Sequence, residues 1–467
     1  MLTRLFLISK EALKLLFWAW RHRSEAEFQV QMARRIREVF EKLGPTFIKL
    51  GQTLSMRPDF IPQAYCSEFE KCLDQAPALP FSQISQALNS ELKKPRSQIF
   101  SHIDARPLAA ASLSQVHKAT LVSGQKVAIK VLRPGVGKLI QQDIRVIYFF
   151  VRLFSGFGHL GKMGKSHWLD LVHRVKIWLQ EEIDYHQEAK NIKLMQEEMV
   201  EFDDFIFPSP HPRISTKRVL VMDLIEGWSL NHLIKLRRKN KLPRLPFDPV
   251  ERTIRIIQVM GSMSLGRGYY HADLHPANVI FTPKGEIAIL DFGLIKFFDL
   301  NQRKGALFFM LGGIFGNVDI IIRSFDKIAE KTSGLYDERR LRHQMEKATQ
   351  AYVGQPASII SNGQMAVRLI NICLTHGVKF DWDIMLYVRS ALSMDGMILG
   401  MCPEYVFSTS NRQHYITSYL KIIMEEFASV PNLIGLSDDI IEIAKTAPSF
   451  FHDILQKKKA TRTSKQH

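Results

Sequence analysis

Three side chains within residues 270–298 have the types and spacing to do chemistry together: Asp273, Asn278 and Asp291. The apolar runs VIF and EIAIL, separated by TPKG, predict a β-hairpin between Asn278 and Asp291 that brings them side by side. Amide and carboxylate oxygens are suitable ligands for Mg²⁺. Asp273 could orient an attacking hydroxyl group or accept its proton. The pattern therefore indicates magnesium-dependent phosphoryl transfer.

Protein kinases place their catalytic base and metal ligands in this order: an Asp, an Asn, a hairpin and then Asp-Phe-Gly. The order predicts two upstream partners, a lysine on a strand and an acid on a helix. Lys130 ends the run VAIK, and Glu188 lies in the helical stretch LQEEIDYHQEAKN. Singly, Lys130 fits an exposed strand lysine and Glu188 a solvated helix residue. With the downstream residues, they predict the pair that binds the phosphates of a nucleotide.

The histidines of the same segment allow another interpretation, because His-x-Asp-x-His is a possible metal-ligand spacing of a hydrolase. No second cluster of His and Asp in the sequence completes such a ligand set, so this interpretation is the weaker one. His271 occupies the position of the kinase catalytic-loop histidine, followed by Ala272 instead of arginine. We expect His271 to have a structural role and His275, before Pro276, to shape the loop.

The remaining sequence supplies the elements that must position these residues. Residues 1–100 have helical character, 108–133 predict a β-hairpin, and 139–199 are helical again. After a second β segment that ends at Gly227, everything except the hairpin at 279–290 is predicted helical. The expected fold is α+β: a protein-kinase-like two-lobe fold with a helical N-terminal extension. The predicted domains are the extension (1–100), a small mixed lobe (101–225), a large helical lobe (226–455) and a basic tail (456–467).

The composition of the whole chain indicates a folded globular protein. With 467 residues, 46% of them hydrophobic, the chain can bury a large core. The net charge of +17 indicates either solvated basic faces or an anionic partner such as nucleic acid or membrane phosphate, and we do not expect nucleic acid. The cysteines form no C-x-x-C pair, which favours a reducing compartment without a disulfide framework. They are Cys66, Cys72, Cys373 and Cys402.

The start of the chain, LTRLFLISKEALKLLFWAW, carries too many charges for a membrane-spanning helix and has no signal cleavage site. It predicts an amphipathic helix, which could lie in a membrane interface or pack on the protein's own body. The second apolar run, GALFFMLGGIFG from Gly305, is too short to span and predicts a buried helix.

Several sequence blocks together resemble the UbiB (AarF-domain) family of atypical, protein-kinase-like proteins. They span residues 44 to 293, and the first is not found in ordinary kinases. The blocks are GPTFIKLGQTLSMRPDFIP (44–62), LAAASLSQVHKA (108–119), VAIKVLRPG (127–135), EEIDYHQEAKN (181–191) and HADLHPANV with LDFG.

The first block carries what looks like the family's K-x-G-Q signature, at Lys49, Gly51 and Gln52. The resemblance implies that this segment covers the pocket where a protein kinase admits its peptide substrate. The residues agree with such a role, because Lys49 and Gln52 share one helical face and Gly51 permits close approach by a neighbour. Without the resemblance, a polar face with an incidental glycine would be the simpler interpretation.

Ala109, Ala110, Ala111 and Ser112 look like the family's alanine-rich loop, which replaces the glycine-rich loop over the nucleotide phosphates. Alanine resists backbone conformations that glycine permits, so the resemblance implies slow or altered phosphoryl transfer. Ser114 stands where many relatives have glycine, a departure that changes the loop.

Glu182 and Asp184 look like the family's E-x-D signature. Side chains two apart on one helix point to nearly opposite sides, so we expect a helix break between them or a division of duties. The resemblance implies that one acid pairs with Lys49 or reaches a metal ion. Separately, the kinase order predicts that the backbone from Met222 to Leu224 hydrogen-bonds the adenine edge.

The resemblance implies an atypical kinase that binds ATP and Mg²⁺ and hydrolyses ATP or transfers its γ-phosphate. It also implies support of isoprenoid-quinone (ubiquinone) biosynthesis, with quinone-pathway proteins or a quinone-like lipid as partners. Two alternatives stay open: a small-molecule or lipid kinase, and a pseudokinase scaffold. We expect a peripheral place, with anionic lipid, on the cytoplasmic face of a bacterial inner membrane or inside an organelle. The tail, HDILQKKKATRTSKQH, differs from relatives that have a hydrophobic C-terminal anchor.

Overall fold

The computed structural model describes residues 2–407 apart from 26, 56, 58–60, 73–75, 156–164 and 331–336. The predicted basic tail and the end of the predicted large lobe, from residue 408, lie outside the described residues. The chain divides into two compact units. The first comprises Met1–Glu198, Phe207–Ile225 and Phe292–Leu294, and the second comprises Met199–Ile206, Glu226–Asp291 and Ile295–His467.

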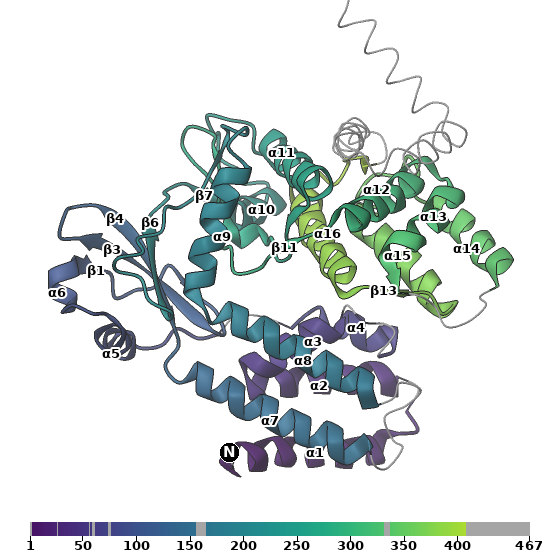
Figure 1. Ribbon diagram of the computed structural model, residues 1–467, viewed down its shortest axis with the longest axis horizontal. Coiled ribbons are helices and arrows are strands. Elements are labelled where there is room, and N and C mark those ends of the chain that lie inside the picture. Colours follow the sequence, from purple (N-terminus) through teal and green to yellow (C-terminus); the bar gives the residue numbers. More distant parts are fainter. Residues whose placement is uncertain are drawn as a thin grey trace, which may run out of the picture. The chain divides into compact units, whose positions relative to one another are not determined.

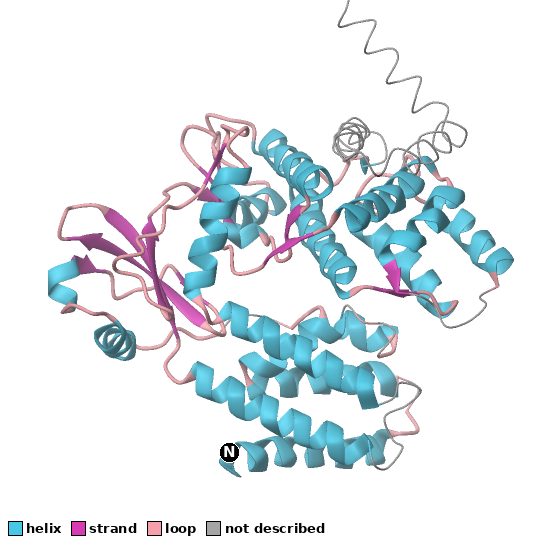
Figure 2. Cartoon of the chain, in the orientation of Figure 1, coloured by secondary structure: helices cyan, strands magenta, loops and turns pink. Residues whose placement is uncertain are grey.

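One boundary between the units lies between Ile225 and Glu226, but Met199–Ile206 belongs to the second unit and Phe292–Leu294 to the first, so the predicted domain bounds stay predictions. The predicted extension and small lobe share the first unit, so the finer division at residue 100 stays a prediction. Helices predominate in both units (Figure 2).

The first unit contains an antiparallel sheet and helices on both sides of it in sequence (Figure 1). The sheet has the order β1-β3-β4-β6, with β2 paired to β3. Its strands are β1 (Phe100–Ile103), β2 (Ala109–Ala110), β3 (Ser114–Leu121), β4 (Lys126–Leu132) and β6 (Val219–Asp223). Its helices are α1 (Leu2–His22), α2 (Phe28–Leu43), α3 (Pro45–Ser55), α4 (Gln63–Phe69), α5 (Phe81–Glu91), α6 (Arg96–Ile99), α7 (Val136–Ser155), α8 (Lys165–Glu182) and α9 (Tyr185–Glu198).

The β3–β4 hairpin has the predicted turn, with Gly124 at φ +89°. Val127, Ile129 and Val131 of β4 are buried in one core cluster together with Ile84 of α5. Because successive side chains of a strand point to opposite faces, Lys130 projects from the other face of the sheet. The alternation of apolar and basic residues in KVAIKVL therefore decides which face carries the lysine.

Helix α1 packs on the protein's own body, while a place in a membrane interface stays a prediction. One face packs on the first unit, where Ile8 joins a buried cluster with Phe47 and Val146. Arg4 on this face donates from Nη2 to Oδ2 of the buried Asp143 at 2.9 Å. The opposite face is apolar yet 61–78% exposed, through Leu2, Phe6, Leu13, Leu16, Phe17 and Trp20.

The second unit contains short strands and a set of packed helices (Figure 1). Its strands are β5 (Phe205–Ile206), β7 (Trp228–Ser229), β8 (Tyr269–His271), β9 (Val279–Phe281), β10 (Ile287–Ile289), β11 (Ile295–Phe297), β12 (Ala329–Glu330) and β13 (Lys379–Phe380). Its helices are α10 (Leu230–Arg238), α11 (Pro249–Ser262), the π-helix η1 (Met263–Arg267), the 3₁₀-helix η2 (Pro276–Asn278), α12 (Leu300–Phe315), α13 (Val318–Ile328), α14 (Glu338–Gln350), α15 (Asn362–Thr375) and α16 (Trp382–Met401).

The predicted hairpin is present as β9 and β10, with Ile280 opposite Ala288 and Gly285 at φ +82° in the turn. The expectation that the rest of this region is helical is wrong for β7, β8, β11, β12 and β13. These strands have only two or three residues, and such short segments show no periodicity in the sequence.

Helix α12 contains the apolar run from Gly305, and its residues 303–314 are buried, as predicted. Gly305 and Gly312 permit α13 to approach, since an added Cβ atom would lie 2.3 Å from Ile328 and 2.5 Å from Ile321. Within the described chain, α16 is the helix whose length and composition would suffice to cross a membrane. Because 61% of its apolar window is buried within the protein, a core helix explains the same features.

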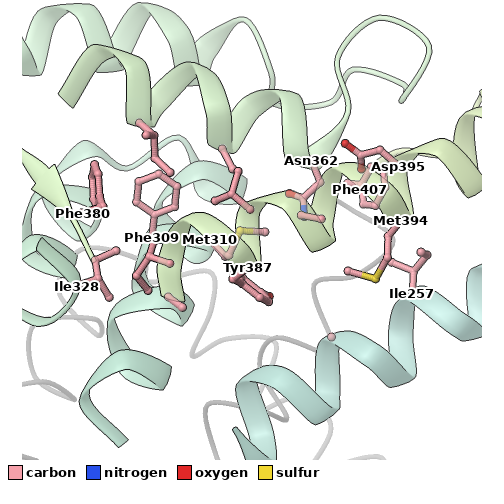
Figure 3. A pocket seen from close by; sticks show the side chains of 17 residues that line it. Ile257, Phe309, Met310, Ile328, Asn362, Phe380, Tyr387, Met394, Asp395 and Phe407 are labelled. Carbon is pink, nitrogen blue, oxygen red and sulfur yellow. The ribbon is translucent and has the colours of Figure 1, made fainter. Parts of the chain in front are cut away.

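An apolar pocket of about 40 Å³ lies among α11, α12, α15 and α16 in the second unit. Figure 3 shows Phe309, Ile328 and Phe380 toward one end and Asn362 and Asp395 toward the other. The Asp395 carboxylate accepts hydrogen bonds from the Ser361 hydroxyl and from the Gly363 N–H, the latter at 2.8 Å. Burial nevertheless raises the pKa of Asp395 to about 7, because the charged form loses its hydration.

We expect this carboxylate to make the protein less stable as the pH rises. The folded state holds the Asp395 proton up to about pH 7, whereas the unfolded chain releases it near 3.8, so folding binds a proton between these values. The free energy of unfolding should fall by up to about 4 kcal/mol across this window. Urea unfolding at pH 5 and pH 8 covers the upper two pH units of this window and should show a fall of about 2.7 kcal/mol.

Asp395→Asn should lack this component of the pH dependence, because the amide does not titrate. Asp299→Asn, at the exposed start of α12, is the matched control and should keep it. Equal pH dependence in the wild type and Asp395→Asn would contradict the assignment.

Candidate active site

Lys130 and Glu188 form a buried ion pair in the first unit. Lys130 Nζ lies 2.7 Å and 2.9 Å from the two carboxylate oxygens of Glu188, and the side chains are 12% and 3% exposed. The ammonium group also lies 5.4 Å from the ring centroid of Tyr185. Strand β4 supplies the lysine and the first turn of α9 supplies the acid. The predicted pairing is thus present, while its catalytic role stays a prediction.

A second buried ion pair joins the K-x-G-Q segment to the end of α8. Lys49 Nζ lies 2.7 Å from Glu182 Oε1, with the side chains 4% and 13% exposed. The same ammonium group lies 5.0 Å from the Trp178 ring centroid. Gln52 donates from Nε2 to the Cys72 carbonyl at 3.3 Å, which ties α3 to the chain after α4. Lys49 and Gln52 therefore both fix the position of α3.

The helix break expected in the E-x-D signature is present. Helix α8 ends at Glu182 and α9 begins at Tyr185. Asp184 accepts from the backbone N–H of His186 at 3.1 Å and forms an ion pair with Lys217 at 3.0 Å. The two acids thus have different partners: Glu182 binds Lys49, and Asp184 stabilises the start of α9 and binds Lys217.

The alanine-rich segment forms a tight β2–β3 turn. Ala109 and Ala110 lie in β2 rather than in a loop, opposite Val116 and Gln115 of β3. The Ala111 N–H donates to the Ser114 carbonyl at 2.9 Å, which closes the turn around the buried Ser112. A residue after β4 also stabilises the turn: Arg133 donates from Nε to the Ala111 carbonyl at 2.8 Å.

Met222 and Leu224 both have backbone partners within the sheet, and their adenine contacts stay a prediction. Met222 lies within β6, opposite Ala128 of β4, and a bridge to Pro210 flanks it on the other side. The Leu224 N–H already donates to the Lys126 carbonyl at 3.3 Å. This N–H is therefore used between β4 and the residue that follows β6.

In the second unit, His271 organises the backbone around the predicted catalytic and metal-binding residues. Its Nδ1 accepts from the Asp273 N–H at 3.2 Å, so its Nε2 carries the proton and donates to the Asp291 carbonyl at 2.6 Å. The Ser390 hydroxyl donates to the His271 carbonyl at 2.6 Å. These contacts give His271 the structural role that we expected.

Asn278 and Asp291 meet at the base of the β9–β10 hairpin. The Leu290 N–H donates to the Asn278 carbonyl at 2.9 Å, which places Asp291 beside Asn278 in the chain register. His275 shapes the preceding turn, because its Nδ1 accepts from the Ala277 N–H at 3.1 Å. Burial lowers the pKa of His275, and Arg389 adds to this effect while Asp273 opposes it.

The donor set of Asn278 and Asp291 fits Mg²⁺, which takes few protein ligands and completes its shell with substrate phosphates and water. Among the residues that the structure describes, no group of three or more His, Cys, Asp or Glu side chains is placed to hold a metal ion. The hydrolase interpretation of His271 and His275 therefore gains no support.

Arg389 and Asn191 are two residues that the sequence analysis did not assign. Arg389 of α16 lies 3.0 Å from Asp273, from Nη2 to Oδ2, and is 14% exposed. Asn191 of α9 donates from Nδ2 to the carbonyl of Phe292, in the Asp-Phe-Gly segment, at 2.8 Å. Asn191 is the last residue of the block EEIDYHQEAKN, so the sequence pattern could have identified it. No motif marks Arg389.

The predicted residues thus form two local groups. Lys130, Glu188, Lys49 and Glu182 belong to the first unit, and Asp273, Asn278 and Asp291 belong to the second. The convergence of Lys130, Glu188, Asn278 and Asp291 around a single polyphosphate stays a prediction.

This combination of a kinase-like sheet, a lysine–glutamate pair and an Asp-Asn-hairpin-Asp arrangement defines an atypical kinase-like protein. The model of the ABC1 atypical kinase-like domain matches residues 71–324, and the chain belongs to this family.

Named relatives agree with this assignment. An uncharacterized aarF domain-containing chloroplast protein kinase of Arabidopsis thaliana is 32% identical over 276 residues, 58% of this chain and 50% of the relative. The Arabidopsis chloroplast protein ACTIVITY OF BC1 COMPLEX KINASE 3 is 32% identical, over 64% of this chain and 40% of the relative. An uncharacterized protein of Synechocystis is 26% identical, over 90% and 62%. The chain therefore spans 40–62% of the length of these relatives.

Among solved structures, the chain is similar to Rv3197 of Mycobacterium tuberculosis in complex with erythromycin. The TM-score is 0.45 and the identity is 19%, over 76% of this chain and 92% of that chain.

Gly51→Ala should destabilise the K-x-G-Q segment. An added Cβ atom would lie 2.9 Å from Cys72 Sγ and 3.0 Å from Phe40 Cδ2, and both side chains are packed against other parts of the first unit. We expect a loss of about 1–3 kcal/mol in the free energy of unfolding, measured by urea denaturation.

Gly396→Ala is the matched control, because an added Cβ atom in this part of α16 meets nothing within 4 Å. Alanine there should leave stability unchanged or raise it by up to about 1 kcal/mol. Similar stability losses in both variants would contradict the packing role of Gly51.

Proposed function

We propose that this chain binds ATP with Mg²⁺ and releases or transfers the γ-phosphate slowly, with ATP hydrolysis as the main reaction. The observation that carries the proposal is the buried Lys130–Glu188 pair, at 2.7 Å. An isolated lysine at this position would be costly to bury, and the pair supplies an oriented ammonium group for phosphate oxygens. Membership of the atypical kinase-like family supports the same reaction class.

Each group has a distinct part in this proposal. Lys130 binds the α- and β-phosphates, while Glu188 fixes the lysine in place. Asn278 and Asp291 hold the metal ion, which supplies positive charge for the transferred phosphoryl group. Asp273, oriented by Arg389, positions the attacking hydroxyl or water.

Two observations favour slow hydrolysis over efficient transfer to a peptide. The turn over the proposed phosphate site carries alanines, and Arg133 fixes its backbone through the Ala111 carbonyl. Such a turn has less freedom to fold around phosphate groups than a glycine-rich loop. In addition, the buried Lys49–Glu182 pair holds the K-x-G-Q segment in place, which supports its proposed role of closing the site to a peptide.

We further propose that the protein works at a membrane surface, where it supports isoprenoid-quinone biosynthesis. The exposed apolar face of α1 supports the first part, because its aromatic and aliphatic side chains could enter the interface of an anionic membrane. Lys10, Lys14, Arg21 and Arg23 add positive charge nearby. The link to quinones is supported by the resemblance to the UbiB family alone.

The catalytic proposal predicts loss of ATP turnover in Asp291→Asn. Without this carboxylate the metal ion loses a charged ligand, so phosphate release from ATP should fall at least about 100-fold. Release of γ-phosphate with Mg²⁺, with and without anionic vesicles, measures the effect. Asp319→Asn, at the exposed start of α13, is a matched control that should keep full activity.

Asp273→Asn separates an enzyme from a scaffold. An enzyme should lose turnover but still bind nucleotide, because Asp273 acts on the attacking group. If the wild-type protein binds no nucleotide, the catalytic proposal is wrong. Full biological function in Asp273→Asn would support the scaffold alternative.

The membrane proposal predicts that Phe6→Gln, Phe17→Gln and Trp20→Gln together abolish flotation with anionic vesicles. The three side chains are 64–69% exposed, so thermal unfolding should change little. Val122→Gln, Val200→Gln and Ile359→Gln remove equally exposed apolar side chains elsewhere and should leave flotation intact. Equal flotation of both triple variants would refute the role of α1.

A further inference from the structure

The first unit contains a large groove that none of the proposed catalytic residues lines. Its volume is about 1280 Å³, above the range of about 300–1,000 Å³ that is usual for small-molecule sites. Neither Lys130 nor Glu188 belongs to its lining. The groove is therefore distinct from the phosphate site proposed at Lys130.

Basic side chains dominate the charge of this groove. Six cationic residues line it, namely Arg133, Lys138, Arg145, Lys176, Lys217 and Arg218. The acidic residues in the lining are Glu91 and Asp184.

Both acids are already neutralised by partners within the lining. Arg218 Nη1 lies 2.9 Å from Glu91 Oε1, and Lys217 Nζ lies 3.0 Å from Asp184 Oδ2. Arg133 donates hydrogen bonds to two backbone carbonyls, of Ala111 and Pro77.

Lys138, Arg145 and Lys176 have no hydrogen-bond or ion-pair partner in the part of the chain that the structure describes. Lys138 and Arg145 are seven residues apart on α7 and so share one helical face, which they present to the groove together with Gln141. Lys176 comes from the neighbouring α8 (Figure 1). Three unpaired cations thus border one cavity from two helices.

The groove also has neutral features that suit a ligand with a hydrogen-bonding head and an apolar part. Gln141, Gln180 and Tyr148 place polar groups in the lining, and Ile140 and Ile144 form part of its floor. Concentrated positive charge in a concave surface focuses the field and attracts anions, and phosphate groups pair well with lysine and arginine.

We propose that this groove is a binding site for a phosphate-bearing anion, supplied either by a free phosphate compound or by a lipid headgroup. Lys138, Arg145 and Lys176 contact the phosphate, and the ion-paired residues Lys217 and Arg218 border it. Binding there does not require the nucleotide site, because neither Lys130 nor Glu188 lines the groove.

The test uses the full chain with Lys130→Gln and Glu188→Gln together, which removes phosphate binding at the proposed nucleotide site without leaving one buried charge unpaired. Titration calorimetry follows the binding of two probes, inorganic pyrophosphate and monomeric dihexanoyl phosphatidic acid. Dihexanoyl phosphatidylcholine, with no net charge, controls for the acyl chains. Because these lipids are used below their micelle concentration, the exposed face of α1 does not dominate the signal.

Lys138→Gln, Arg145→Gln and Lys176→Gln together should weaken binding at least about tenfold, since each removes a charge-assisted contact. Lys193→Gln, Arg106→Gln and Arg213→Gln remove the same charge from exposed positions outside the groove and should weaken binding less than twofold. Thermal unfolding checks that both triple variants fold. Arg145→Gln alone should give an intermediate affinity.

If the groove triple variant loses affinity for pyrophosphate only, the ligand is a free phosphate compound. If it loses affinity for phosphatidic acid only, the ligand is a lipid headgroup. If neither probe binds, or if both triple variants lose affinity equally, the proposal is overturned. The result is separable from the catalytic proposal, because a chain that binds no nucleotide can still bind these probes.

Discussion

The buried ammonium group of Lys130 is the constraint from which the arrangement of the first unit follows. A lysine that is 12% exposed needs a carboxylate beside it, and Glu188, at 3% exposure, provides one at 2.7 Å. Removing one partner of such a pair typically costs about 3–5 kcal/mol, because the other charge stays buried. Helix α9 must therefore lie with its first turn against β4, and the position of α9 in turn places Asn191 at the Phe292 carbonyl.

In the second unit, hydrogen bonds fix the backbone around the predicted catalytic and metal-binding residues. His271 joins the Asp273 N–H to the Asp291 carbonyl, and Ser390 holds His271 from α16. Arg389, the residue before Ser390, balances the Asp273 carboxylate. Two neighbouring residues of α16 thus fix the position of His271 and balance the charge of Asp273.

The sequence predicted those features that depend on local pattern or motif order. The kinase order of residues gave the pairing of Lys130 with Glu188, and the two-residue spacing of Glu182 and Asp184 led us to expect a helix break or a division of duties. Arg389 escaped prediction because an ion pair between distant segments leaves no periodic signal. The hydrogen bond from the Leu224 N–H to the Lys126 carbonyl was not predicted, because the run VLVMDL marks a strand but not the register of its pairing with β4. The ion pair of Asp184 with Lys217 could not be predicted either, because it also joins distant segments of the chain.

Seven consecutive residues, 182–188, provide carboxylates for lysines from three separate parts of the chain: Lys49 in α3, Lys130 in β4 and Lys217 before β6. As the protein emerges from the ribosome, Lys49 and Lys130 are made before any of these acids. Until residues 182–188 follow, burying either lysine would leave its charge unpaired. The N-terminal helices and the sheet must therefore wait for this short segment, so they mature together and not in the order of synthesis.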